Sequence, residues 1–239
     1  MGTSVHLGEN MRRIQITESL ELLAEETGIH IGDGSMPFFA QRGKYTYSVR
    51  GNLSEREYYD AHVVPLIQAT YGVKPNCYID TKRSSYGFEV GSKQIVEFKS
   101  NCLGLPRGPK TSIRVPVVFM DDKHTYSHLL RGIFDTDGSV KKYPRSVGVE
   151  FTTMSQQLCV DMKEMLEKLG IFCHVYEFGK RCEIVVLGVR ETKKFFKIIF
   201  SPKIRNTGAV FSSLPRNARK RDGGTPSAVG LSIDGFSEV

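Results

Sequence analysis

The sequence predicts an α+β fold made of two similar halves, each with helices and strands in the order αββαββα. One observation is an internal repeat: the pattern Gly-Ile-x-x-small-Asp-Gly-Ser occurs at residues 28–35 and again at 132–139. A second observation is that the segments following each copy match in type and order. Four strands per half imply two antiparallel four-stranded sheets in a pseudo-twofold arrangement.

Each copy of the motif closes an amphipathic helix, one ending at Asp33 and the other at Asp137. Residues that could face a core recur there at helical spacing. They are Leu20, Leu23, Thr27 and Ile31 in the first copy, and Leu129, Gly132, Ile133 and Thr136 in the second.

The elements expected behind the two motifs also correspond. Ser54 and Ser155 are residues that favour the N-cap of a second helix, and Gly72 and Gly170 suit its C-terminal end. We expect strands at 36–40, 44–50, 77–81 and 86–90 in the first half, and at 140–143, 147–152, 172–178 and 182–187 in the second. The second helix of each half should cover 57–71 in the first half and extend to 169 in the second. The third helix should begin at 91–93 in the first half and at 188–190 in the second.

These elements predict four segments along the chain. The first half should span 14–105 and the second half 122–203, with a linker over 106–121. Residues 204–239 begin with basic residues and continue rich in Gly, Ser and Pro, which predicts a flexible tail.

The composition fits a globular protein, with 40% hydrophobic and 25% charged residues. The sequence contains neither a secretory signal nor a stretch that could span a membrane, and its five cysteines lack C-x-x-C spacing, so we expect a cytoplasmic protein without disulfides. The net charge of +7 and the pI near 9.1 favour a polyanionic partner.

Small residues repeat four positions apart in each motif helix: Gly28 with Gly32, and Gly132 with Thr136. A glycine inside a helix costs about 1 kcal/mol relative to alanine. Close packing of the two matched helices would offset that cost, so we expect these residues at a helix–helix interface.

If the two helices pack side by side in parallel, Asp33 and Asp137 meet at the negative ends of two helix dipoles. Two carboxylates there repel each other unless a cation lies between them. Oxygen ligands favour Mg²⁺, and a metal held by carboxylates is a common means of hydrolysing phosphodiesters. A single Asp-Gly would be an ordinary end of a helix, whereas two matched copies favour a metal site.

The two motifs, Thr-Gly-Ile-His-Ile-Gly-Asp-Gly at 27–34 and Arg-Gly-Ile-Phe-Asp-Thr-Asp-Gly at 131–138, resemble the paired signatures of LAGLIDADG homing endonucleases. Segments 58–66 and 103–110 also resemble single-chain, two-motif members of the archaeal intron type. The resemblance covers roughly residues 14–203.

This resemblance implies a saddle whose two sheets lie in successive major grooves of double-stranded DNA, with the motif helices between them. It implies that Asp33 and Asp137, with the backbone carbonyls of Gly32 and Thr136, hold divalent metal. Mg²⁺ is the expected ion, and Mn²⁺ or Ca²⁺ could replace it for binding.

The family also uses basic residues near the metals. By position after the fourth strand, Lys93 and Arg190 are our candidates, the alternative being exposed charges at a helix start. Arg50 is a weaker candidate, for which a phosphate contact at the rim is the alternative.

Basic and aromatic residues on the expected hairpins and turns suit a long DNA footprint, because a two-stranded ribbon fits the major groove. Any one of these clusters alone would be a solvated strand face, but the clusters recur at equivalent places in both halves. The candidate DNA-binding residues are Arg42, Lys44, Tyr45, Tyr47, Arg50, Lys82 and Arg83 in the first half, and Lys141, Lys142, Arg145, Lys180 and Arg181 in the second.

The sequence therefore predicts a site-specific, metal-dependent DNA endonuclease. The alternatives are an RNA maturase that assists intron splicing and a non-cleaving DNA-binding regulator on the same fold. The regulator should have lost one or both aspartates, and both are present. We expect a monomer because one chain supplies both motifs, and we expect no self-splicing because the residues that it requires are missing from the chain ends.

Overall fold

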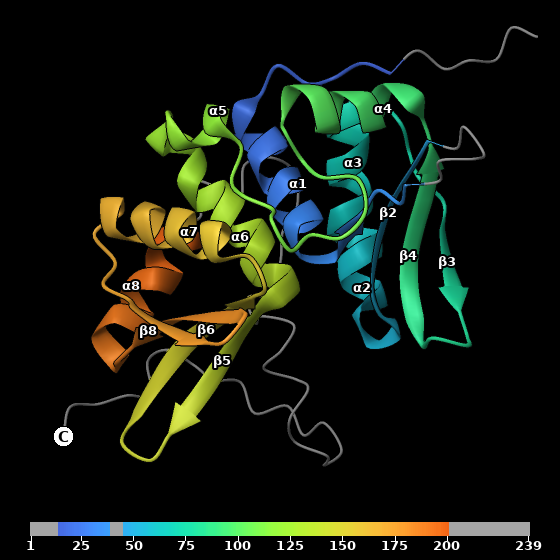
Figure 1. Cartoon of the computed structure of the whole chain (residues 1–239). Coiled ribbons are helices and arrows are strands. Elements are labelled where there is room, and N and C mark those ends of the chain that lie inside the picture. The colour runs from blue at the N-terminus through green and yellow to red at the C-terminus, as the bar shows by residue number, and fades with distance from the viewer. Residues whose placement is uncertain (1–13, 39–44, 201–239) are drawn as a thin grey trace, which may run out of the picture.

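The computed structural model describes residues 14–38 and 45–200, and the tail expected at 204–239 lies outside them. Two four-stranded sheets flank a central group of helices, with the hairpin tips of both sheets projecting to the same side, the lower side in Figure 1. The α+β prediction is confirmed.

The first half contains short helical segments between its strands. Its elements are α1 (Leu20–Asp33), β1 (Gly34–Ser35), β2 (Thr46–Asn52), η1 (Leu53–Glu55), α2 (Arg56–Tyr58), η2 (Tyr59–Val63), α3 (Val64–Tyr71), β3 (Cys77–Asp80), β4 (Ser85–Gly91), α4 (Lys93–Glu97) and η3 (Phe98–Cys102).

The second half follows the same order, with longer regular α-helices at its second and third helical positions. After α5 (Val117–Met120), which falls within the expected linker, its elements are η4 (Lys123–Thr125), α6 (Tyr126–Asp137), β5 (Gly138–Tyr143), β6 (Ser146–Thr153), α7 (Gln156–Lys168), β7 (His174–Phe178), β8 (Arg181–Leu187) and α8 (Val189–Ile199).

The two sheets share one topology. Their strand orders are β1-β2-β4-β3 and β5-β6-β8-β7, and every neighbouring pair is antiparallel. The residue after each motif aspartate enters the edge strand at an equivalent place, because Gly34 pairs with Val49 and Gly138 pairs with Phe151. Each motif helix therefore leads directly into its sheet.

Helices α1 and α6 pack against one another so closely that their backbones touch. A Cβ added to Gly28 would lie 2.9 Å from the Ile133 nitrogen, and one added to Gly132 would lie 2.7 Å from the Ile29 nitrogen. A Cβ on Gly32 would overlap the Thr136 side chain. Residues 28, 32, 132 and 136 thus lie at the helix contact, and the matching order of contacts makes the two helices parallel.

The second helix of the first half differs from the continuous helix expected over 57–71. It contains η2, which is a π-helix, directly before Pro65. Proline lacks the N–H that a helix interior requires and crowds the preceding turn, so a widened turn there is a physical consequence. Asn52, rather than Ser54, caps this segment, and it forms a capping box with Glu55.

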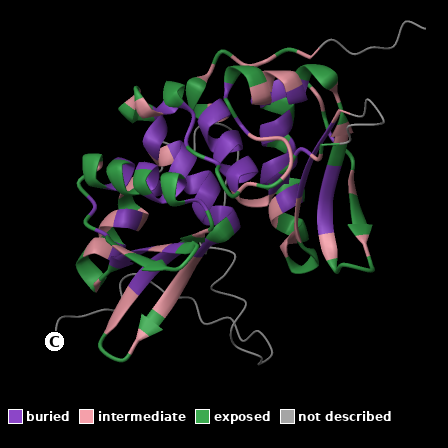
Figure 2. Ribbon diagram, in the orientation of Figure 1, coloured by how far each residue is buried: buried purple, intermediate pink, exposed green. Residues whose placement is uncertain are grey.

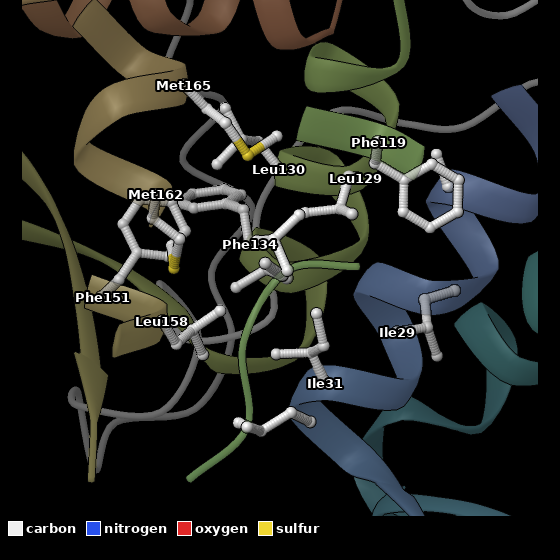
Figure 3. Packing of buried hydrophobic residues seen from close by; sticks show 14 of the residues in the cluster. Ile29, Ile31, Phe119, Leu129, Leu130, Phe134, Phe151, Leu158, Met162 and Met165 are labelled. Carbon is white, nitrogen blue, oxygen red and sulfur yellow. The ribbon is translucent and has the colours of Figure 1, made fainter. Parts of the chain in front are cut away.

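The core lies between the helices and the inner faces of both sheets, where Figure 2 shows the buried residues gathered. In the second half, Phe134 of α6 packs against Phe151 of β6, with ring centroids 5.6 Å apart (Figure 3). Phe134 also packs against Phe195 of α8, with ring centroids 5.2 Å apart. Such tilted aromatic pairs favour a fixed packing angle between helix and sheet.

Within residues 14–38 and 45–200, no helix is both long and apolar enough to cross a membrane. The cysteines at positions 77, 102, 159, 173 and 182 are all free thiols.

We predict that Gly28→Ala lowers the free energy of unfolding by about 1–3 kcal/mol, because overpacking of a tight contact has this cost. The added methyl group would meet the backbone of α6. Gly91→Ala is the matched control, since nothing lies within 4 Å of its added Cβ. Urea unfolding of both variants checks this, and equal stability would contradict the backbone contact.

Candidate metal and nucleic-acid site

The C-terminal ends of α1 and α6 bring Asp33 and Asp137 to the same place. A Cβ on Gly32, in the last turn of α1, would lie 3.4 Å from Oδ2 of Asp137. The carboxylate of α6 therefore lies against the end of α1, beside the aspartate that closes that helix. The parallel packing required for a shared metal site is present.

Tyr59 reaches Asp33 from the π-helix η2. Its hydroxyl donates to Oδ2 of Asp33 at 3.0 Å, and its side chain is 0% exposed. Its ring lies edge-on to the rings of Tyr58 and Tyr86, with both centroid distances at 6.0 Å. Neighbouring aromatic residues thus hold the hydroxyl in position at the site.

Lys110, from the segment between the two halves, inserts its ammonium at the end of α1. Nζ donates to the carbonyl oxygens of Ile31 at 2.8 Å and His30 at 3.3 Å, and also to that of Gly32. Burial lowers the pKa of Lys110, whereas the charges of Asp137 and Asp33 oppose that shift. A positive charge is thereby placed beside both aspartates.

A cavity of about 270 Å³ opens beside these groups. Lys110, Asp137 and Gly32 line it on one side, and the apolar side chains of Phe151 and Leu158 line it on another. Apolar walls exclude water and strengthen electrostatic interactions within the site. Charged groups in this cavity therefore interact more strongly than they would on an open surface.

A buried polar cluster joins the two motif helices about two turns before the aspartates. Glu25 of α1 lies 2.7 Å from His62 of η2, 3.4 Å from Arg131 of α6 and 3.9 Å from His128 of α6. Burial alone would raise the pKa of Glu25, but His128, His62 and Arg131 together hold it well below its ordinary value. The cluster thus fixes α1, α6 and η2 around one charge.

A second buried cluster anchors the other side of α1. Glu26 accepts hydrogen bonds from Tyr47 at 2.5 Å, from Lys99 at 2.7 Å and from Tyr71 at 2.8 Å. Lys99 is carried by the π-helix η3 and is fully buried, with Nζ 4.5 Å from the Tyr47 ring centroid. The consecutive glutamates Glu25 and Glu26 therefore bind α1 to two different groups of neighbouring elements.

The structure corrects the expected place of Tyr47. Tyr47 was a candidate for DNA binding, yet it is 0% exposed because its strand position faces the core, where its hydroxyl donates to Glu26. Arg42 and Lys44 lie outside the described residues. Tyr45 is half-buried, with the guanidinium of Arg107 5.0 Å from its ring centroid.

The structure does not bring Lys93 and Arg190 to the aspartates. Strand β4 ends at Gly91, paired with Thr46, whereas β1 begins at Gly34, paired with Val49 on the same strand. At about 3.3 Å per residue and 4.8 Å per strand, this register separates the helix start from the site by more than about 10 Å. Lys93 is 63% exposed and lies 3.6 Å from Glu97.

The strand register of the second sheet likewise keeps Arg190 away from Asp137. Leu187 at the end of β8 pairs with Gly148, while Gly138 pairs with Phe151, so the register offset repeats. Arg190 is exposed near the start of α8. Lys93 and Arg190 were chosen because they follow the fourth strand of each half, and that position lies away from the aspartates in each sheet.

The outer face of the first sheet carries Arg50, which donates to Glu89 at 2.9 Å and to the hydroxyl of Tyr78. Lys82 and Arg83 are exposed in the following turn. These residues lie on the face opposite the helices, where a duplex has access.

The outer face of the second sheet carries Lys141, which forms ion pairs with Glu150 and, at 3.4 Å, with Glu183. Lys142, which pairs with Val147, is the next residue of β5 after Lys141. Because side chains alternate along a strand, Lys142 points to the opposite face of the sheet. The remaining candidates in this half, Arg145, Lys180 and Arg181, are exposed at the turns of the two hairpins.

Two functional candidates, Lys110 and Tyr59, were missed as site residues from the sequence. Tyr59 reaches Asp33 from the π-helix η2. Lys110 follows Gly-Pro in the predicted linker. The signals available were its basic side chain and the family resemblance of segments 58–66 and 103–110, which contain both residues. The tertiary path of the linker decides where the Lys110 ammonium lies.

Comparison with known proteins identifies the shared domain. Residues 125–199, which include the second motif, match the model of a LAGLIDADG-like domain. The structure of I-DmoI in complex with DNA and Mn is similar, with 18% identity, a TM-score of 0.57, and coverage of 76% of this chain and 97% of that chain. The homing endonuclease I-WcaI bound to its DNA recognition sequence has 12% identity and a TM-score of 0.57, covering 83% of this chain and 90% of that chain. At these identities, the likeness shows the fold.

A curated relative matches a shorter stretch. The NrdEB subunit alpha of ribonucleoside-diphosphate reductase from Bacillus subtilis (strain 168) is 26% identical over 112 residues, which is 44% of this chain and 10% of the reductase subunit. The chain thus spans about a tenth of the length of the curated relatives it matches.

Proposed function

We propose that this chain, which carries a LAGLIDADG-like domain in its second half and the LAGLIDADG fold across both halves, is a site-specific homing endonuclease that hydrolyses both strands of a long double-stranded DNA target. The observation that carries this proposal is the meeting of Asp33 and Asp137 at two parallel helix ends, between two sheets with accessible outer faces. We take 14–105 and 122–203 as its two halves, joined by 106–121.

The donors at the helix ends fit a hard divalent cation such as Mg²⁺. The carboxylates of Asp33 and Asp137 would hold it, with the backbone carbonyls of Gly32 and Thr136 as further ligands. In the described part of the chain, no three side chains of His, Cys, Asp or Glu gather as a metal cluster. Phosphate oxygens of the DNA and water would therefore complete the coordination, as an ion with few protein ligands requires. When bound, such an ion polarises the phosphate and activates water.

The chain's own residues supply the remaining chemistry. The carboxylates of Asp33 and Asp137 would bind the cation at the shared helix ends. Lys110 holds an ammonium beside both carboxylates, where it would stabilise the negative charge that develops on the cleaved phosphate. The Gly32 carbonyl is bonded to Lys110 here, so Lys110 and a cation would share that end of α1.

The outer faces of the sheets would contact the duplex. Arg50 and Lys141 are already oriented by carboxylates on those faces, which suits base contacts. Exposed basic residues at the turns suit phosphate contacts, which supply most of the affinity. This group comprises Lys82, Arg83, Arg145, Lys180 and Arg181.

Because one chain supplies both aspartates, the arrangement favours a monomer. We expect this monomer to act in the cytoplasm. Intron RNA is the second candidate partner, since a maturase could use the same basic faces. Retention of both aspartates favours cleavage over a purely regulatory role, because a protein that only binds DNA has no need of paired carboxylates at a dipole end.

A selection on a randomised duplex library tests this function, run once with Mg²⁺ and once with Ca²⁺. We expect one long site that is cut with Mg²⁺ and only bound with Ca²⁺. Asp33→Asn or Asp137→Asn should slow double-strand cleavage about a thousandfold or more while the DNA remains bound, because several kcal/mol of charge stabilisation are lost.

Asp121→Asn is the matched control, since Asp121 is exposed at the end of α5, and it should cleave normally. If the folded protein cuts no duplex yet binds intron RNA without magnesium, the assigned function would change from endonuclease to maturase. Loss of binding together with cleavage in both aspartate variants would show that the aspartates hold the helix interface instead.

Lys110→Met should slow cleavage of the selected target about 10²- to 10³-fold, the range found for removal of one group that stabilises a transition-state charge. Target affinity in Ca²⁺ should change little, because Lys110 lies at the helix ends rather than on a sheet face. Lys74→Met removes an exposed lysine of the first half and is the control. A Lys110→Met enzyme with the wild-type single-turnover rate would exclude this role.

A further inference from the structure

We propose that Tyr59 is a positioning residue for the metal site and that its hydroxyl fixes the carboxylate of Asp33. This inference rests on the proposed function and deepens it. The contact that carries it is the hydrogen bond from the Tyr59 hydroxyl to Oδ2 of Asp33, at 3.0 Å.

The hydroxyl is held rigidly. Tyr59 is 0% exposed, and its ring is flanked by those of Tyr58 and Tyr86 in edge-on contacts. A buried phenol normally requires a hydrogen-bond partner, and here that partner is a charged oxygen. Hydrogen bonds to charged groups are stronger than those between neutral groups, so the contact restricts the rotamers of Asp33.

The π-helix explains how a helix residue reaches this aspartate. Residues 59–63 form η2 just before Pro65, and the wider turn changes which side chains face α1. From the same π-helix, His62 reaches Glu25 at 2.7 Å. The irregular turn therefore presents two polar side chains to α1, one at the charged cluster and one at the aspartate. π-helical turns are frequent at functional sites.

The second half offers a different neighbour to its aspartate. Its counterpart helix α7 is a regular α-helix whose sequence, from Gln156 to Lys168, contains no Tyr, Ser or Thr. Leu158 and Met162 of α7 line the cavity that also contains Asp137. A hydroxyl from the second helix thus binds the aspartate of the first half, whereas α7 supplies apolar side chains to the cavity beside Asp137, which Thr111, Thr152 and Thr153 also line.

Groups that orient a metal ligand typically change metal affinity or activity by about 10- to 100-fold when they are removed. Tyr59→Phe keeps the aromatic ring and its packing but removes the hydroxyl. We therefore expect the Mg²⁺ concentration for half-maximal cleavage to rise about tenfold or more. One strand should be cut more slowly than the other, so that nicked duplex accumulates.

Tyr86→Phe is the matched control. The Tyr86 hydroxyl also donates to an aspartate, Asp60 at 2.6 Å, and its ring touches that of Tyr59, but Asp60 is outside the metal site. This variant should lose a comparable hydrogen bond while its metal dependence and strand ratio stay at wild-type values.

Mn²⁺ titration of the full chain, followed by electron paramagnetic resonance, gives a readout that does not depend on cleavage. Tyr59→Phe should bind Mn²⁺ about tenfold more weakly, and Tyr86→Phe should bind it normally. If the wild-type chain cuts no selected duplex, the endonuclease proposal fails, and the Mn²⁺ titration still decides whether Tyr59 positions a ligand.

Unchanged Mn²⁺ affinity in Tyr59→Phe would overturn the inference. Equal slowing of both strands, together with a lowered melting temperature and an unchanged Mg²⁺ midpoint, would also overturn it, because that pattern reports lost packing alone. Weaker Mn²⁺ binding with nick accumulation in a normally folded variant supports it.

Discussion

The contact between the backbones of α1 and α6 is the constraint on which the rest of the structure depends. Gly28 and Gly132 face each other so closely that neither position accepts a Cβ without movement of the opposing backbone. This approach sets the helices in parallel and in register, so that both end at the same level. Each helix then enters its own sheet at an equivalent position, and the sheets take their places on either side. The proximity of the aspartates follows from this helix contact.

That geometry concentrates negative charge, and the surrounding structure compensates for it. Two carboxylates and two helix C-termini meet at one place, where the dipoles add to the repulsion. Lys110 supplies a nearby positive charge, while Glu25 and Glu26 tie α1 to both sides of the protein through buried ion pairs. Breaking a buried pair by removing one partner costs about 3–5 kcal/mol, so these clusters resist displacement of α1. The site can therefore retain a repulsive arrangement that a less constrained helix pair would relax by moving apart.

Much of this could be predicted from the sequence, because repeats and periodicity are local signals. The two Asp-Gly motifs, the small residues at the helix contact and most of the strands are readable from spacing alone. The first strand was expected at 36–40, whereas β1 is Gly34–Ser35, directly after Asp33. Residue positions that depend on how the chain folds in three dimensions could not be predicted from the sequence. Tyr47 is of a residue type that suits DNA binding, but at its position on the strand the side chain points into the core, beside Glu26. Lys93 follows the fourth strand, yet the sheet register carries it away from the aspartates. Tyr59 reaches Asp33 from a π-helix that precedes Pro65, and Lys110 reaches the last carbonyls of α1 through the course of the connecting segment.

The central claim is that the paired helix ends form one metal site. Crystals of the full chain with its selected duplex, grown with Mn²⁺ and measured at the manganese absorption edge, test it most directly. The account predicts anomalous density between the carboxylates of Asp33 and Asp137, within about 2.2 Å of their oxygens, a typical distance for such ions. Manganese bound elsewhere, with these carboxylates contacting only protein, would contradict the account.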